Sequence, residues 1–264
     1  MIHALPLCKE DLFVTMQIAI RVHDSSIVLA SDTLSRTQHR QYDSSVIDHG
    51  VLGVATRSKI VFCENHDIAV AYAGFADEGA DPALELAAHL SKEDKIDDNL
   101  GPVLTAWGDG YFARSNGTSA RERDHPVCTL LVVNPHTEYC CFWQLRINKK
   151  SNDEASSTYL LNGLGANEAI FWPLYFKANE HRALDLAGAT GVAAVTILTA
   201  HRLDPARIGG LEICQYVNGR WDKPWSPTRI RDIEDRFADF NHQLQDSVFG
   251  LTALNISEPV PKMS

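Results

Sequence analysis

The first regular segment of the chain reads TMQIAIRV (residues 15–22), breaks at HDSS (residues 23–26) and returns as IVLASD (residues 27–32). Two β-rich runs on either side of a short polar break are typical of a β-hairpin. Both runs are apolar along most of their length, which indicates strands covered on both faces rather than strands with one face in water. This stretch therefore predicts the first two strands of a buried sheet.

The same pairing of strands recurs further along the chain. Hairpins are expected within residues 60–73 and 127–145, and a closing hairpin turns at Asn218-Gly219. A short strand is expected at residues 159–161. Polar stretches predict loops at residues 33–58, 113–125 and 146–158.

Helical patterns separate these strands. One begins at Pro82 behind Asp81 as its N-cap. The others are expected at residues 98–112, 167–177, 183–203 and from Ser226-Pro227 onward, with a loose tail after Leu251.

Strands arrive in antiparallel pairs and helices follow in pairs. This order suits an α+β fold, a four-layer αββα sandwich with two antiparallel sheets, rather than a doubly wound sheet in which single strands alternate with helices. A chain of 264 residues can bury such a core without disulfides or metal. We divide it into a leader or propeptide (residues 1–14), a sandwich domain (residues 15–224) and a C-terminal helix with its tail (residues 225–264).

The composition excludes several partners. The chain carries 24 Lys+Arg against 34 Asp+Glu, a formal net charge of −10, which disfavours nucleic acid and anionic membrane surfaces. No apolar run is long enough to span a membrane, and the N-terminus lacks a secretory-signal pattern. The six cysteines have no CxxC spacing and lie mostly in apolar runs, so buried thiols in a reducing cytoplasm are expected. HExxH, P-loop and GxSxG motifs are absent, and we expect no metal and no cofactor.

A set of short motifs occurs in a fixed order along the chain. Thr15 opens the first strand, Asp32 follows the second, Lys59 precedes Ile60-Val61-Phe62, the segment AYAGFAD spans residues 71–77, and Asp204 precedes Gly209-Gly210. This ordered set resembles that of proteasome β-type subunits, which are N-terminal-nucleophile (Ntn) hydrolases, and specifically the bacterial proteasome-like branch. The resemblance covers about residues 15–220.

The resemblance implies a fold, a reaction and partners. The fold is the Ntn-hydrolase αββα sandwich, and the reaction is peptide-bond cleavage through an acyl ester on Thr15. By the same resemblance Asp32, Lys59 and Asp204 support Thr15, and the Gly74 N–H binds substrate at the developing oxyanion. Self-association into a ring or helical oligomer and an ATP-dependent unfoldase partner are also implied.

The chemistry explains why these residue types are needed. A threonine hydroxyl is a weak nucleophile that needs a base. A free α-amine, with a pKa of about 7.7–8.0, can act as that base when threonine is the first residue. Thr15 follows Val14 in this chain, so this role requires cleavage of the Val14–Thr15 bond. Lys59, held by Asp32, would lower the pKa of the hydroxyl.

Some features leave alternatives open. Seventeen positions separate Thr15 from Asp32, one more than the family pattern, so either Thr15 or Met16 could occupy the nucleophile position. Two supporting hydroxyls of the family are replaced, one within Gly163-Leu164-Gly165 and one at Arg207-Ile208. Thr15 as a simple strand-opening residue and Asp204 as a helix stop are further interpretations. The alternative functions are a catalytically inactive structural subunit and a small-substrate Ntn amidase.

Overall fold

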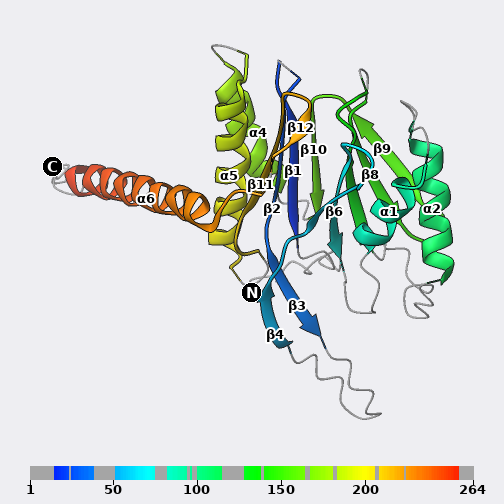
Figure 1. Cartoon of the computed structure of the whole chain (residues 1–264). Coiled ribbons are helices and arrows are strands. Elements are labelled where there is room, and N and C mark those ends of the chain that lie inside the picture. Colours follow the sequence, from blue (N-terminus) through cyan, green and yellow to red (C-terminus); the bar gives the residue numbers. More distant parts are fainter. Residues whose placement is uncertain are drawn as a thin grey trace, which may run out of the picture. The chain divides into compact units, whose positions relative to one another are not determined.

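The computed structural model describes residues 15–23, 25–38, 51–74, 82–93, 96, 100–114, 128–137, 140–163, 167–180, 183–205, 208–222 and 224–255. The chain divides into two compact units, Met1–Pro224 and Trp225–Ser264. The first unit carries two stacked sheets with helices outside them (Figure 1). The described residues of the second unit include one helix.

The first sheet contains the hairpin with which the chain opens. Within the described residues its strand order is β10-β1-β2-β11-β12, and all neighbours are antiparallel. β1 pairs with β2 from Gln17↔Ser31 to Arg21↔Ile27, and every residue of β2 is buried, as its apolar run predicted. The bounds are β1 Met16–Arg21, β2 Ile27–Ser31, β10 Tyr159–Gly163, β11 Glu212–Val217 and β12 Arg220–Trp221.

The second sheet follows the order of the chain, β5-β6-β7-β8-β9, again with antiparallel neighbours. It contains the two hairpins predicted within residues 60–73 and 127–145. The bounds are β5 Ile60–Phe62, β6 Ala69–Gly74, β7 Cys128–Val133, β8 Phe142–Ile147 and β9 Asn152–Ser156.

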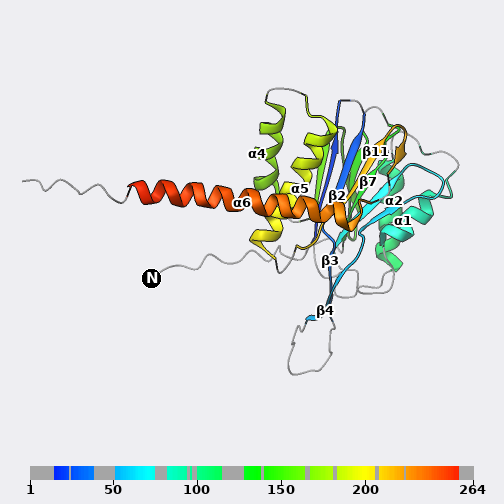
Figure 2. The same ribbon diagram turned by 60° about the vertical axis from the view of Figure 1, so that its left-hand side comes forward.

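One pair of helices covers the outer face of each sheet, which confirms the predicted αββα sandwich. α5 (Leu186–Leu203) packs against β1 and β2, with α4 (Asn167–Asn179) beside it. α1 (Pro82–Leu90) packs against β6, and α2 (Gly101–Arg114) against β8 and β9. The turned view in Figure 2 shows the same layering, with the two helix pairs on opposite sides of the sheets. Asp81, the predicted N-cap of α1, lies outside the described residues.

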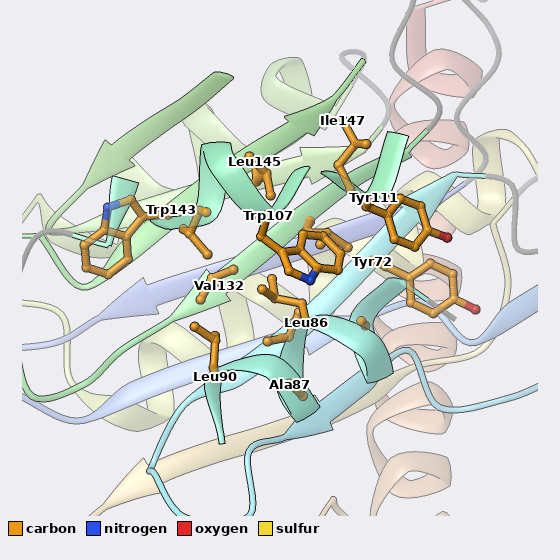
Figure 3. Packing of buried hydrophobic residues seen from close by; sticks show 14 of the residues in the cluster. Tyr72, Leu86, Ala87, Leu90, Trp107, Tyr111, Val132, Trp143, Leu145 and Ile147 are labelled. Carbon is orange, nitrogen blue, oxygen red and sulfur yellow. The ribbon is translucent and has the colours of Figure 1, made fainter. Parts of the chain in front are cut away.

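The middle strands are apolar on both faces because each face meets a different layer. Along β7, Leu131 points into a core shared with β2 of the facing sheet, where it joins Leu29. Its neighbours Leu130 and Val132 point the other way, into a core formed with α1 and α2 (Figure 3). This alternation is the period-two geometry of a strand. It accounts for the nearly continuous apolar runs in the sequence.

Two stretches expected to be loops contain strands. β3 (Leu34–Gln38) and β4 (Val51–Thr56) pair with each other in a separate two-stranded sheet, within the stretch 33–58. β9, within the stretch 146–158, is an edge strand whose residues are exposed or half-buried. Such strands bury little side-chain surface, so their sequences lack the apolar run that marks a buried strand.

The second unit is built around α6 (Pro227–Asn255), which begins at the predicted proline and ends a few residues past Leu251, where the loose tail was expected to begin. The Ser226 hydroxyl accepts a hydrogen bond from the Arg229 N–H at 3.4 Å, as an N-cap side chain does.

In the first unit, α5 is long and apolar enough to cross a membrane by length and composition. Half of this helix is buried inside the protein, as in the core helix of a folded domain.

Candidate active site

The first hairpin places Thr15 beside Asp32. Because β1 and β2 pair without irregularity, the residue before β1 and the residue after β2 meet at the same end of the sheet. The Met16 N–H donates to Asp32 Oδ1 at 2.9 Å, and the Asp32 N–H donates to the Met16 carbonyl at 3.0 Å. Thr15 is 4% exposed and Asp32 is 0% exposed. The carboxylate is therefore fixed by backbone bonds before any cation is considered.

Lys59 reaches this pair from the other sheet. It lies directly before β5 and is 2% exposed. Its Nζ lies 3.0 Å from both Asp32 oxygens and 2.9 Å from Thr15 Oγ1. The structure thus brings together three residues that are far apart in the sequence, a hydroxyl, an ammonium and a carboxylate.

The same geometry distinguishes Thr15 from Met16. Thr15 presents its hydroxyl to Lys59, whereas Met16 contributes its backbone N–H to Asp32 and has a fully buried side chain. The β1–β2 ladder is regular, and the chain turns between Val22 and Ser26, where the Val22 N–H donates to the Ser26 carbonyl. In that turn Ser25 adopts a left-handed conformation with φ 66°.

Burial shapes the electrostatics of the site. Loss of water lowers the pKa of the Lys59 ammonium, and the Asp32 carboxylate opposes this change. Burial likewise raises the pKa of Asp32, while the Lys59 charge and the Met16 N–H oppose it. A buried ion pair of this kind contributes little net stability, but loss of one partner leaves the other charge uncompensated. The ammonium lies beside the Thr15 hydroxyl, where its positive charge favours the deprotonated form of that oxygen.

A second buried acid, not identified from the sequence, contacts the lysine segment. Glu212, at the start of β11, is 7% exposed. Its Oε1 accepts a hydrogen bond from the Ser58 hydroxyl at 2.6 Å, and its Oε2 accepts one from the Lys59 backbone N–H at 3.1 Å. Burial raises its pKa. The available signal was an acid opening an otherwise buried strand, which is rare unless the acid has a partner.

Glycines border the site where backbone approaches backbone closely. Gly163, at the end of β10, pairs with Met16 and has φ 106°. A Cβ at this position would overlap the carbonyl oxygen of Thr15. Gly210 has φ 68°, and its Cβ would overlap the Thr33 hydroxyl, just after Asp32. The Gly163 and Gly209-Gly210 motifs therefore lie on either side of the Thr15–Asp32 end of the sheet.

The remaining predicted site residues are placed less directly. Gly74 ends β6 and pairs with Cys128, while the following residues 75–81 lie outside the described residues. Asp204 ends α5 as its C-cap: its N–H donates to the Ala200 carbonyl, and its carbonyl accepts from the Ile208 N–H. This is the helix-stop geometry. The roles of Gly74 at an oxyanion and of Asp204 in support of Thr15 stay predictions.

The part of the chain that the structure describes contains no set of side chains suited to bind a metal ion. No group of three or more His, Cys, Asp or Glu side chains gathers there in a way that could hold an ion. The described cluster places the Thr15 hydroxyl beside a buried ammonium that can polarise it.

Comparison with known proteins identifies the fold. No protein-family model and no curated protein sequence matches the chain. Solved structures match over most of its length. One is an Anbu (Gly-1) mutant from Hyphomicrobium sp. strain MC1, at 12% identity and TM-score 0.58, covering 89% of this chain and 99% of that one.

Two further structures agree. Anbu (ancestral beta-subunit) from Yersinia bercovieri matches at 14% identity and TM-score 0.57, covering 94% of this chain and 100% of that one. The helical assembly of the Anbu complex from Pseudomonas aeruginosa matches at 16% identity and TM-score 0.57, covering 93% of this chain and 98% of that one. At such identities the likeness concerns the fold. The chain has the proteasome-like Ntn fold.

Proposed function

We propose that this protein is a threonine-type peptidase of a self-compartmentalising, proteasome-like complex, with Thr15 as the nucleophile. The observation that carries the proposal is the 2.9 Å separation between Lys59 Nζ and Thr15 Oγ1, with the same ammonium 3.0 Å from both Asp32 oxygens. The arrangement joins residues 15, 32 and 59, and it occurs on a proteasome-like Ntn fold. Fold and cluster together favour this reaction over other uses of a buried ion pair.

In the proposed reaction Thr15 Oγ attacks the carbonyl carbon of a peptide bond while its proton passes to the Thr15 α-amine. The carbonyl π electrons move onto oxygen, where the Gly74 N–H is the proposed donor. Collapse of this intermediate breaks the C–N bond, and the leaving amine takes the proton. The acyl ester left on Thr15 is then hydrolysed by water, which restores the hydroxyl. Lys59 remains an ammonium that stabilises the developing alkoxide, and Asp32 holds Lys59 in place.

Release of residues 1–14 is an essential part of the proposal. While Thr15 is joined to Val14, its nitrogen is an amide that cannot accept a proton. Cleavage of the Val14–Thr15 bond produces the α-amine, whose ordinary pKa of about 7.7–8.0 suits a general base. A chain that still carries residues 1–14 is therefore the inactive precursor in this scheme.

Self-association is the proposed setting for this activity. One of the similar structures is a helical assembly of the Anbu complex, which supports a ring or helical oligomer for this chain. Head-to-tail contacts either close into rings or continue as helices. An ATP-dependent unfoldase as partner and a cytoplasmic location belong to the same proposal. The location is supported by the buried free thiols Cys63, Cys128, Cys141 and Cys214.

A second candidate is a catalytically inactive structural subunit with the same fold. Two departures favour it, because Leu164, between Gly163 and Gly165, and the pair Arg207-Ile208 stand where the family often carries a serine. A small-substrate Ntn amidase would use the same cluster on a single amide. The amidase predicts fast cleavage of one small amide and slow cleavage of varied peptides.

The deciding experiment combines intact mass with covalent labelling. A peptide epoxyketone reacts with both the hydroxyl and the α-amine of an N-terminal threonine. We expect purified protein to begin at Thr15, to gain one inhibitor mass per chain and to lose peptidase activity. The Thr15→Ala variant should fold normally and bind none, while Thr15→Ser should retain labelling. A chain that keeps residues before Thr15, remains unlabelled and cleaves no peptide would establish the structural subunit instead.

A further inference from the structure

Glu212 links the two sheets at the backbone of the lysine that contacts Thr15. It belongs to β11 of the first sheet, whereas Ser58 and Lys59 precede β5 of the second. Both of its carboxylate oxygens are used, one by the Ser58 hydroxyl at 2.6 Å and the other by the Lys59 N–H at 3.1 Å. Glu212 also pairs with Ser31, the residue directly before Asp32. One acid is thus in register with the segments that carry both members of the ion pair.

We propose that Glu212 is a positioning residue for the Thr15 reaction, which anchors the Ser58-Lys59 segment to β11 and supplies the second negative charge near the Lys59 ammonium. The inference rests on the proposed function, because it concerns how Lys59 serves Thr15. Glu212 touches neither Thr15 nor Asp32 in the hydrogen bonds described above. It acts through the Ser58-Lys59 segment.

The anchoring function follows from the length of the lysine side chain. Lys59 must span from the second sheet to Thr15 Oγ1 and Asp32 in the first, so its reach depends on where its backbone lies. A flexible side chain holds a 2.9 Å contact only if its root is fixed. Glu212 fixes the Lys59 backbone, and it does so from the first sheet, where Thr15 and Asp32 lie. Misplacement by about 1 Å at such a site can cost on the order of 100-fold in rate.

The charge acts in addition to the anchoring. The negative charge of Glu212 raises the pKa of Lys59, in the same direction as Asp32, whereas the neighbouring Arg57 lowers it. Hydrogen bonds from Ser58 and the Lys59 N–H favour the carboxylate form of Glu212 against the effect of its burial. Without Glu212, burial and Arg57 would still lower the pKa of Lys59, and Asp32 would be the one of these two acids left to raise it. Lys59 would then lose its proton at lower pH.

The test uses Glu212→Gln, which keeps the shape and removes the charge. The alkaline limb of the pH–kcat profile, where Lys59 loses its proton, should move to lower pH by at least about half a pH unit. Glu212→Asp retains the charge but shortens the side chain, so kcat should fall while the limb stays in place. Glu154→Gln, at an exposed acid of β9, is the charge-matched control and should change neither.

A titration of Lys59 that needs no activity separates this inference from the proposed function. In protein with ¹³C-labelled lysine, the Lys59 Cε resonance is assigned by its loss in Lys59→Arg. Its midpoint should fall in Glu212→Gln and hold in Glu154→Gln. An unchanged midpoint, or a loss of kcat with an unmoved alkaline limb, would overturn the role assigned to Glu212.

The remaining outcomes are equally decisive. A wild-type chain that neither cleaves nor labels, but whose Lys59 midpoint still falls in Glu212→Gln, would overturn the proposed function and leave the Glu212–Lys59 coupling standing. If Glu212→Gln does not fold, Ser58→Ala tests the anchor. It removes one hydrogen bond and keeps the charge, so kcat should fall several-fold without movement of the limb. Unchanged kcat in Ser58→Ala would count against the anchor.

Discussion

Gly163 lies so close to Thr15 that a single added methyl group would overlap the Thr15 carbonyl oxygen. The pair joins the end of β10 to the start of β1, and Gly163 has a φ of 106° that other residues rarely adopt. The position of the proposed nucleophile therefore depends on a residue that has no side chain.

The first prediction concerns this glycine. Gly163→Ala should lower the free energy of unfolding by about 2–4 kcal/mol, because it combines backbone strain with overlap. Gly191→Ala is the matched control: this glycine lies inside α5 with nothing within 4 Å of an added Cβ. The control should gain about 0.5–1 kcal/mol. Urea titration of both variants measures the difference, and equal stabilities would contradict the close contact.

The second prediction concerns the buried ion pair. Lys59→Met should destabilise the protein by about 3–5 kcal/mol, since Asp32 would remain charged and buried without its cation. Asp32→Asn should cost a similar amount for the converse reason. The double variant should be more stable than the sum of the single effects implies. A double-mutant cycle in urea measures this coupling, and simple additivity would mean that the two charges do not interact in solution.

The third prediction is a pH dependence of stability. Burial lowers the pKa of Lys59 in the folded protein below its ordinary value of 10.5. Between the lowered value and 10.5 the unfolded chain binds more protons than the folded one, so the contribution of Lys59 to stability increases as pH rises through that window. The stability of wild type relative to Lys59→Met should therefore increase on the alkaline side. A flat or falling difference between pH titrations of the two proteins would reject the direction.

The fourth prediction separates an oxygen nucleophile from a sulfur one. Burial raises the pKa of Cys63 and of Cys141 to about 11, and it also raises that of Cys214. At pH 8 these thiols are almost entirely protonated and shielded, so iodoacetamide should leave them unmodified in the folded protein. Peptidase activity should survive the same treatment. Peptide mapping by mass spectrometry checks the three sites, and loss of activity with alkylation of one of them would point to a cysteine mechanism.

The sequence predicted the sandwich because its central strands are buried on both faces. The runs that became β1, β2, β6 and β7 are apolar for that reason, and their hairpins were identified from the turns between them. β9 and the β3–β4 pair were not identified from the sequence. An edge strand and a two-stranded sheet bury little side-chain surface, so their sequences need no apolar run. The distinction between strand and loop in polar segments depends on neighbours that are distant in sequence.

The candidate site shows the same division. Thr15, Asp32 and Lys59 were found as motifs in order, and the structure brings them within hydrogen-bond distance. Glu212 was not found, because its importance depends on the pairing of β11 with β2 and on the approach of Ser58 from the second sheet. The pattern of apolar and polar residues along the sequence does not show which residues of β11 and β2 pair with each other. An acid at the start of a buried strand is the cue to look for.

The hydroxyl and the ammonium of the cluster come from different sheets, and packed side chains such as Leu29 and Leu131 fill the space between those sheets. Any sliding of one sheet over the other changes the Thr15–Lys59 distance directly. The rate of the proposed reaction would then depend on the relative position of the two sheets. Core substitutions far from Thr15, or contacts made when copies assemble, would alter the rate without touching a single reacting atom.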